Sequence, residues 1–327
     1  MMKLKYLFSN EDLAEMILKN WKHDEDDIDM FKYYRISANA IYPFKVKGEI
    51  QFLRFAPKSE KKNISILAEL DFIHYLKSKQ YGVLEPVKSK DNKELIEVET
   101  PWGEYLATVF KRVKGEQIIK TDFNDDIIFT YGKALGKLHQ LSSGYLPNID
   151  QRWSCEEVLQ WISDILIKYP EEKLALQEAK KIQNFYTTLP MTKDNFGLVH
   201  YDFECDNVFF DEASKTCNVI DFDDAMYHWY VMDITQALES LKEYIPNDKY
   251  QDKKQCFIDG YNTEYNISDD MMSIMPIFRR FANLYGYTRV LRSIEEKWDN
   301  EPQWMEKLRI DLSQTNESDS SFFGDEI

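Results

Sequence analysis

Apolar and polar residues alternate along the first third of the chain, which is the pattern of half-buried β-strands. Two β-hairpins are predicted there, with strands at 40–45 and 50–55 and at 95–100 and 104–110. Between the hairpins, residues 62–80 carry apolar side chains near helical spacing, and Gly82 follows as a stop signal. This part of the chain is therefore expected to be a sheet with one long helix.

After Gly115 the apolar residues recur mainly at helical spacing. Helices are predicted at 126–141, 155–168, 170–189, 233–244, 252–261 and 269–292. The interval 199–223 differs, because two short apolar runs at 207–210 and 218–220 flank the turn-forming residues 211–216. A small hairpin is expected in an otherwise helical region.

The length of 327 residues suits two lobes better than one core. With 43% hydrophobic residues, such a chain can bury a substantial core. The predicted fold class is α+β and bilobal, with a β-rich N-terminal lobe at 1–112 and a larger, mainly helical lobe at 113–312. The tail at 313–327 is rich in Ser, Asn, Asp and Glu and is expected to be frayed.

The formal net charge of -16 argues against nucleic acid as the partner, because binding of phosphate backbones requires a basic surface. A cationic substrate would be steered favourably to such a protein. The same charge is also explained by solubility alone. Both interpretations stay open at this point.

The four cysteines form no C-x-x-C pair and show no metal-ligand spacing, so reduced thiols are expected. The apolar patch before Glu11 is too short for a signal peptide, and no later apolar run has membrane length. A cytoplasmic protein that does not enter a membrane is predicted, either a monomer or a homodimer.

The most informative motif is H-x-D-x-x-x-x-N at 200–207, followed by an apolar strand that ends at Asp221. Phosphoryl transfer needs a carboxylate beside the attacking hydroxyl and oxygen ligands for Mg²⁺. Asp202 can accept the hydroxyl proton, while Asn207 and Asp221 can bind the metal together with nucleotide phosphates. These residue types at this spacing therefore suit phosphoryl transfer with Mg²⁺ and a nucleotide, although the isolated motif also arises by chance.

This stretch resembles the aminoglycoside phosphotransferase and choline kinase family, which are small-molecule kinases with a protein-kinase-like fold. The resemblance extends to segments at 37–42, 52–54, 134–139 and 257–261. It implies transfer of the γ-phosphate of Mg-ATP to the hydroxyl group of a small molecule, for example an aminoglycoside, choline or another amino alcohol. Residue by residue it makes Asp202 the catalytic base, Asn207 and Asp221 the metal ligands, His200 an organiser of the loop, and Asp233 a brace from the following helix.

The resemblance also implies nucleotide contacts at Ser37, Asn39, Arg54, Glu69, Lys111 and Val113. Ser37 and Asn39 would lie in the loop over the phosphates, and backbone groups near 110–113 would receive the adenine. Arg54 stands where the family usually has a phosphate-binding Lys; it keeps the charge, but its planar fork does not replace an ammonium group atom for atom. Glu69 is interpreted either as the ion-pair partner of Arg54 or as a solvated acid.

Side chains in and after the catalytic loop are candidates for a pocket that receives an amine-bearing substrate; they are Glu204, Asp206, Asp223, Asp224 and Trp229. Acids at such positions are more often solvated or loop-capping residues, and the aromatic run at 227–230 is equally typical of core packing. The loop carries Tyr201 and Phe203 where the family commonly has small Gly and Pro, so no particular antibiotic is implied.

Two further hypotheses compete with a small-molecule kinase. One is a nucleotide-binding module that lacks catalysis and acts through a partner, which the replacement of Lys by Arg54 favours and the complete trio Asp202, Asn207 and Asp221 opposes. The other is a protein kinase, which is disfavoured because only about a dozen residues separate Asp221 from Asp233, too few for a peptide platform. The acceptor, the choice between ATP and GTP, and the oligomeric state are not determined by the sequence.

Overall fold

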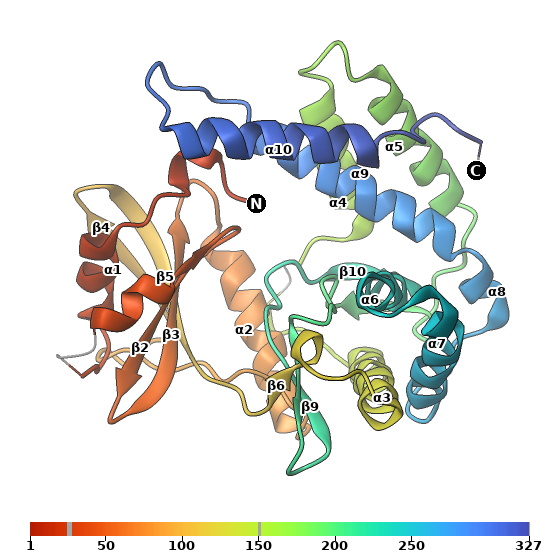
Figure 1. Ribbon diagram of the computed structural model, residues 1–327, viewed down its shortest axis with the longest axis horizontal. Coiled ribbons are helices and arrows are strands. Elements are labelled where there is room, and N and C mark those ends of the chain that lie inside the picture. Colours follow the sequence, from red (N-terminus) through yellow and green to blue (C-terminus); the bar gives the residue numbers. More distant parts are fainter. Residues whose placement is uncertain (25–27, 150–151, 327) are drawn as a thin grey trace. The chain divides into compact units, whose positions relative to one another are not determined.

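The computed structural model describes residues 1–24, 28–149 and 152–326 (Figure 1). The chain divides into two compact units. Unit 1 consists of Met1–Leu70, Leu84–Arg112 and Gly286–Ser321, and unit 2 consists of Asp71–Val83, Val113–Tyr285 and Phe322–Ile327. A unit boundary falls after Arg112, and unit 1 includes Gly286–Ser321 while unit 2 includes Asp71–Val83. The α+β fold class is confirmed, with an antiparallel sheet in unit 1 and mainly helices in unit 2.

Unit 1 is built on an antiparallel sheet with the strand order β1-β2-β3-β5-β4. Its strands are β1 (Arg35–Ile36), β2 (Ala40–Val46), β3 (Glu49–Pro57), β4 (Leu95–Thr100) and β5 (Gly103–Lys111). Both predicted hairpins are confirmed. The first turns at Lys47 and Gly48, whose φ angles are 52° and 82°, and the Asp24 carboxylate accepts both of their amides at 2.9 and 3.0 Å. These bonds lower the pKa of Asp24 and fix the register of β2 on β3.

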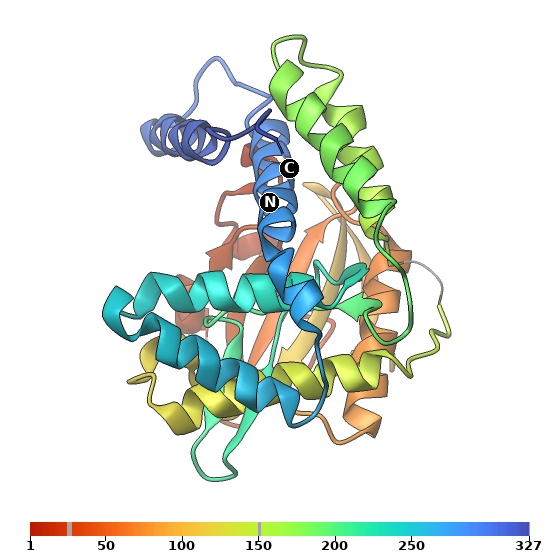
Figure 2. The same cartoon turned by 90° about the vertical axis from the view of Figure 1, so that its right-hand side faces the viewer.

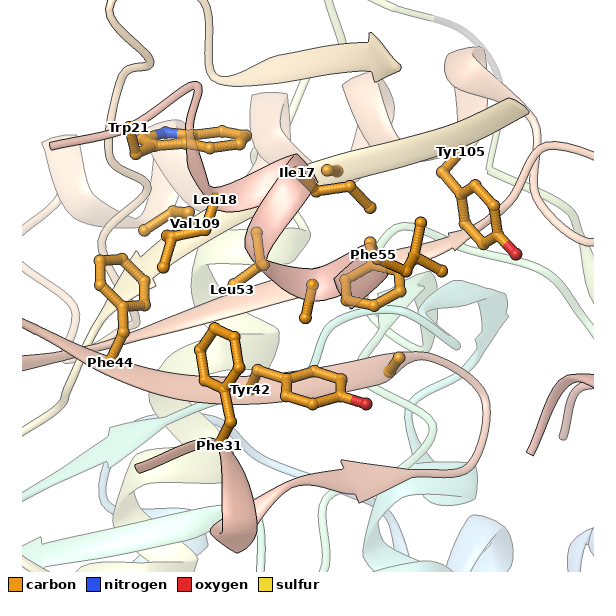
Figure 3. Packing of buried hydrophobic residues seen from close by; sticks show 14 residues of the cluster. Ile17, Leu18, Trp21, Phe31, Tyr42, Phe44, Leu53, Phe55, Tyr105 and Val109 are labelled. Carbon is orange, nitrogen blue, oxygen red and sulfur yellow. The ribbon is translucent and has the colours of Figure 1, made fainter. Parts of the chain in front are cut away.

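The core of unit 1 lies where helix α1 (Glu11–Leu18) covers the sheet. Asn10 caps this helix, since its side chain accepts the Leu13 amide. Figure 3 shows Ile17 and Leu18 packed over sheet residues. The fully buried residues of this cluster include Ile17, Trp21, Phe31, Tyr42, Phe44, Leu53 and Val109. Each large side chain buried in this way stabilises the fold by about 1.5–3 kcal/mol.

The long helix predicted at 62–80 is confirmed as α2 (Asn63–Ser78). The helices of unit 2 are α3 (Asp125–Ser142), α4 (Cys155–Leu166), α5 (Lys173–Tyr186), α6 (Val231–Tyr244), α7 (Asn247–Asn262) and α8 (Asp269–Ser273), and α9 (Met275–Ser293) begins there and continues into unit 1. The single helix expected at 269–292 is thus two helices, broken at Ile274. Pro276 explains the break, because proline is tolerated only in the first turn of a helix.

Helices α3 and α7 lie side by side (Figure 2). Glycines permit their close approach: a Cβ atom at Gly136 would lie 2.3 Å from the Tyr261 carbonyl oxygen, and one at Gly260 would lie 2.0 Å from that of Phe129. Any larger residue would force the helices apart. Close packing of helices thus explains the glycines in the segments 134–139 and 257–261.

Short strands in unit 2 carry the functional motif. One sheet has the order β6-β8-β9, with β6 (Glu116–Gln117), β8 (Val208–Asp211) and β9 (Thr216–Val219), which confirms the predicted small hairpin. A second sheet pairs β7 (Phe196–Val199) with β10 (Met226–Trp229) in antiparallel register. This second pair was not predicted. It brings the residues just before His200 beside the chain that follows Asp221.

The C-terminal segment differs from the expectation of a frayed tail. Helix α10 (Gln303–Asp319) occupies part of it. Beyond this helix, Phe323 is buried, and the Lys181 ammonium donates hydrogen bonds to the carbonyls of Gly324 and Asp325 at 2.5 and 2.7 Å. The chain end is therefore packed on unit 2 as far as it is described, and residue 327 lies outside the described part.

Three short 3-10 helices complete the described elements: η1 (Leu4–Tyr6), η2 (Ile28–Tyr33) and η3 (Ile118–Lys120). Among the helices of the described residues, none combines the length and the apolar character needed to span a membrane.

Candidate active site

The side chains of Asp202 and Asn207 are in direct contact within the loop that precedes β8. The Asn207 amide nitrogen donates to Asp202 Oδ2 at 2.9 Å and to the Asp202 carbonyl at 3.0 Å. Because this contact uses the nitrogen, the amide oxygen of Asn207 is the atom left to act as an acceptor. The pair therefore orients one carboxylate and one amide oxygen from a single loop.

His200 links this loop to the strand that ends before Asp221. Its Nε2 lies 2.8 Å from the Ile220 carbonyl, and its Nδ1 accepts the Asp202 amide at 3.2 Å. A carbonyl can only accept, so Nε2 carries the proton and the neutral ring bridges the two segments. The Ile220 amide in turn donates to the Asn207 carbonyl at 3.0 Å. The structure thus brings together the loop and the residue immediately before Asp221.

Asp233, in the first turn of α6, holds the catalytic loop through its backbone. Its Oδ1 accepts the Tyr201 amide at 2.6 Å, and its Oδ2 accepts the His200 amide at 2.8 Å and His139 Nε2 at 3.1 Å. Asp233 and His139 are fully buried, and burial lowers the pKa of His139. In the neutral His139 ring, Nδ1 then accepts a hydrogen bond from the Tyr261 hydroxyl at 2.9 Å. Both carboxylate oxygens of this buried residue are therefore satisfied by hydrogen bonds.

Two residues of the site have left-handed backbone conformations. Tyr201 has a φ of 70° and Asp221 has a φ of 64°. Such a conformation costs a non-glycine residue about 1–2 kcal/mol and persists where the surroundings over-determine it. The Tyr201 ring is buried, with its centroid 5.4 Å from that of Tyr285. Packing of the Tyr201 ring offsets part of this backbone strain, which a glycine at the same position would not have.

The oxygen donors of Asn207 and Asp221 fit a hard divalent cation. Mg²⁺ is usually held by one or two protein oxygens and retains waters and nucleotide phosphates as its other ligands. The described residues contain no group of three or more His, Cys, Asp or Glu residues that would hold a metal on its own. The donor set therefore suits a cation that arrives with a nucleotide rather than a permanently enclosed metal.

The acidic residues near the loop are partly accessible. Glu204, Asp206, Asp223 and Asp224 are all half-buried. Burial, together with the neighbouring charges of Asp202 and Asp206, raises the pKa of Glu204 to about 8. Glu204 therefore lies close enough to Asp202 and Asp206 to feel both charges, and a cationic group bound there would favour its ionised form.

Trp229 does not belong to that group of partly accessible residues. It is fully buried, and its indole nitrogen donates to the Pro190 carbonyl at 3.0 Å. The ring packs against Tyr186 and Phe196 at centroid distances of 4.9 and 5.1 Å. The prediction of a pocket role is corrected, because β10 directs this side chain into the core of unit 2.

In unit 1, the guanidinium of Arg54 and the carboxylate of Glu69 form a buried bidentate ion pair. The two N···O distances are 2.8 and 2.7 Å, and the residues are 6% and 1% exposed. Arg54 Nε also donates to Thr108 at 3.3 Å, and its guanidinium lies 4.8 Å from the centre of the Phe110 ring. Of the two interpretations of Glu69, the ion pair is the one found, and it fixes the direction of the arginine fork.

The other predicted nucleotide contacts lie in two places, between β1 and β2 and at the end of β5. Ser37 and Asn39 form the turn between β1 and β2, where the Ser37 amide donates to the Asn39 carbonyl at 3.0 Å. The Lys111 amide donates to the Glu85 carbonyl at 2.9 Å, so this amide is already engaged. Val113 is the first residue of unit 2 after the boundary. Contact of Val113 with a nucleotide stays a prediction.

Sequence reasoning did not identify Arg152, whose side chain contacts the loop after Asp221. Its partners include backbone carbonyls of residues 222, 223 and 225. Any residue type offers a carbonyl, so no motif in the sequence signals such a contact. Arg152 is found only when the chain is folded.

Comparison with solved structures first defines the class of fold. The chain superposes on a microcompartment-associated aminopropanol kinase with a TM-score of 0.69 and 17% identity, covering 94% of this chain and 95% of the other. It superposes on amicoumacin kinase hAmiN, solved in complex with AMP-PNP, Ca²⁺ and Ami, with a TM-score of 0.76 and 21% identity over 96% and 95% of the two chains. The predicted bilobal, protein-kinase-like fold class is confirmed.

The family follows from the sequence comparison. The model of the phosphotransferase enzyme family matches residues 44–265, and the chain belongs to this family. Among curated proteins, the amicoumacin kinase of Bacillus subtilis (strain 168) is 25% identical over 325 residues, which cover 94% of each chain. The resemblance to aminoglycoside phosphotransferases and related small-molecule kinases is confirmed.

Proposed function

We propose that this protein is an ATP-dependent small-molecule kinase that transfers the γ-phosphate of Mg-ATP to a hydroxyl group of an amine-bearing acceptor. The observation that carries this proposal is the contact between Asn207 and Asp202. This contact orients the Asp202 carboxylate, which can accept a proton, and leaves the amide oxygen of Asn207 as a possible metal ligand. In-line phosphoryl transfer requires both kinds of group. Membership of the phosphotransferase family supports the reaction class.

In the proposed reaction, the acceptor hydroxyl attacks the γ-phosphorus and its proton passes to the Asp202 carboxylate. The new O–P bond forms while the bond to the bridging oxygen of the β-phosphate breaks, and ADP leaves with that electron pair. Asn207 Oδ1 and Asp221 would hold Mg²⁺, which supplies positive charge to the phosphate oxygens when bound. His200 and Asp233 keep the loop in position, since both hold its backbone. Positioning and charge neutralisation thus supply most of the catalysis.

The nucleotide contacts are proposed from the same resemblance. Arg54 would bind the α- and β-phosphates, with its direction set by Glu69. An arginine fork offers two donors to a phosphate where a lysine offers a single charged nitrogen. Ser37 and Asn39 would lie over the phosphates, and the backbone around 111–113 would receive the adenine.

An amine-bearing acceptor is proposed for two reasons. Glu204 interacts with the charges of Asp202 and Asp206, and the whole chain carries a net charge of -16, which favours the approach of a cation. Kinases named for amicoumacin and for aminopropanol are among the similar proteins, and aminopropanol is an amino alcohol. Asp223 and Asp224 are further candidates for contacts with the amine.

Mg²⁺-dependent ADP release should be measured with purified protein against aminoglycosides, amicoumacin-type antibiotics, amino alcohols, sugars and nucleosides. Asp202→Ala and Asp221→Ala should each lower kcat by about 10²–10³-fold or more, because each removes an interaction made at the reacting phosphate. Asp259→Ala is the matched control, since Asp259 is an exposed acid on α7.

Loss of the compound-dependent signal in both variants, but not in the control, supports the proposal. Near-normal turnover of Asp221→Ala at saturating Mg-ATP contradicts the assigned metal ligand. Nucleotide binding without turnover across the whole panel would favour the non-catalytic module instead.

A further inference from the structure

The guanidinium of Arg152 binds three carbonyl groups of one short loop. Nε donates to the Ala225 carbonyl at 2.7 Å, and Nη2 donates to the carbonyls of Phe222 and Asp223 at 2.9 and 2.7 Å. This loop follows Asp221 directly in the sequence. Arg152 is half-buried and lies about seventy residues away along the chain, as the separation of 70 from Phe222 shows.

The contact matters because all three carbonyl oxygens accept hydrogen bonds from the same guanidinium group. Each carbonyl oxygen carries partial negative charge, so three of them repel one another unless a cation lies between them. A guanidinium is suited to this role, because its planar fork presents several N–H groups at fixed angles. The loop also closes on itself, since the Ala225 amide donates to the Phe222 carbonyl at 3.2 Å. Arg152 therefore stabilises one particular shape of the loop.

Asp221 is held from both sides. On its N-terminal side, the Ile220 carbonyl is bound by His200. On its C-terminal side, the carbonyls of the next two residues are bound by Arg152. A left-handed aspartate with a φ of 64° would relax to an ordinary conformation without such restraints, and its carboxylate would then point elsewhere.

Arg152 is itself well anchored. The next residue, Trp153, accepts the Tyr227 amide at its carbonyl, at 2.8 Å, which attaches this segment to β10. Ser154 then begins α4 with a capping box formed with Glu157. The backbone just after Arg152 is therefore held by a strand contact at Trp153 and by the start of a helix at Ser154.

We propose that Arg152 is a positioning residue for the metal-binding carboxylate of Asp221, acting through the backbone of residues 222–225. The inference rests on the proposed function, because it concerns the same metal site. Loss of Arg152 should weaken Mg²⁺ binding with nucleotide while leaving metal-free nucleotide binding unchanged. Residues that orient a metal ligand are commonly worth about 10–100-fold in metal affinity.

The test compares Arg152→Gln with Arg280→Gln. Arg280 is a matched control in unit 2, because it also donates to backbone carbonyls, those of Asp325 and Glu326, and to buried Glu178. Calorimetric titration of AMP-PNP at a series of Mg²⁺ concentrations, and in EDTA, gives the Mg²⁺ midpoint separately from metal-free affinity. Thermal unfolding of each variant shows how much general stability is lost.

Arg152→Gln is expected to raise the Mg²⁺ midpoint at least about tenfold, with affinity in EDTA within about twofold of wild type. Arg280→Gln is expected to lower Tm and leave the midpoint unchanged. Arg152→Lys keeps the charge but not the fork, so its midpoint should lie between those of wild type and Arg152→Gln. If Arg152→Gln fails to fold, the Mg²⁺ midpoint of Arg152→Lys alone tests the inference.

A Mg²⁺ midpoint of Arg152→Gln or Arg152→Lys that matches wild type would overturn the inference, and so would an equal shift in Arg280→Gln. These failures are distinguishable from failure of the proposed function. If the wild-type protein itself binds AMP-PNP without any dependence on Mg²⁺, the proposed metal chemistry is wrong. If the wild type depends on Mg²⁺ and the Arg152 variants do so equally, only the role of Arg152 is wrong.

Discussion

The proposed phosphate-binding arginine of unit 1 and the proposed catalytic loop of unit 2 are held in different ways. Arg54 is held chiefly by another side chain, Glu69, through two charged hydrogen bonds. The loop is held through its main chain: Asp233 binds its amides, and His200 binds the carbonyl before Asp221. The position of Arg54 therefore depends on the identity of two side chains, its own and that of Glu69. The position of the loop depends instead on the residues that bind its main chain.

This difference explains where the sequence departs from the family pattern. A loop held by its backbone can accept different side chains, so the large residues Tyr201 and Phe203 are compatible with the amide contacts to Asp233. The large rings fill space in unit 2, where both are buried. At Arg54 the departure changes one member of a pair of interacting side chains. We therefore expect substitutions at the ion pair and at the loop braces to have different consequences.

The largest effect is expected at the ion pair. Arg54→Ala leaves the carboxylate of Glu69 buried and uncompensated, which should lower the free energy of unfolding by about 3–5 kcal/mol. The double variant Arg54→Ala, Glu69→Ala should recover much of this stability while nucleotide affinity stays low. Chemical denaturation measures the first quantity and titration with AMP-PNP the second.

Lys58→Ala is the control for this experiment. Lys58 pairs with Glu97 at 2.7 Å on the surface of the same unit, and both side chains are exposed. Exposed pairs contribute about 0–1 kcal/mol, so this variant should be close to wild type. If Arg54→Ala costs no more than Lys58→Ala, the ion pair is not the support that the structure indicates.

A smaller effect is expected when the brace of the loop is changed. Asp233→Asn puts an NH₂ group where the carboxylate accepts three hydrogen bonds, so at least one donor must face another donor. Unfolding free energy should fall by about 2–3 kcal/mol, and kcat should fall because the loop loses its position. Asp259→Asn on the exposed face of α7 is the isosteric control. Equal stability and turnover of Asp233→Asn and wild type would show that the loop does not need this anion.

The smallest effect concerns the core behind β10, which carries no proposed chemistry. Burial lowers the pKa of His228 from 6.5 to about 3. The folded state therefore binds fewer protons than the unfolded chain between these values, so stability is present above about pH 6.5 and is lost as the pH falls. At pH 5 the loss due to this residue should be up to about 2 kcal/mol.

His228→Asn should remove that part of the acid sensitivity, because asparagine can still accept the Trp229 amide but does not become charged. Unfolding free energies at pH 7 and pH 5 test this, with His74→Asn as the exposed control. The difference in unfolding free energy between wild type and His228→Asn should be smaller at pH 5 than at pH 7. A gap that stays constant would mean that His228 does not titrate as its burial implies.

Local pattern was enough to predict the hairpins, the helix α2 and the short β8–β9 hairpin. Their signals are alternation, helical spacing and turn residues such as Gly48 and Pro101, all of which act over a few residues. The break before α9 was missed although Pro276 marked it, and the end of the chain was expected to fray although its helix α10 and buried Phe323 pack on folding. Polar composition described that segment poorly because its few apolar residues find partners far away in the sequence.

What the sequence by itself determined is the set of reactive groups: the H-x-D-x-x-x-x-N motif and Asp221 supply the candidate base and candidate metal ligands, because residue type and local spacing are read directly from the sequence. Only the tertiary structure decided how these groups are held. Arg152 acts on carbonyls 70 residues away, and Trp229 turns into the core because β10 pairs with β7. Such contacts follow from long-range packing and backbone hydrogen bonding, which leave no pattern in the order of the side chains.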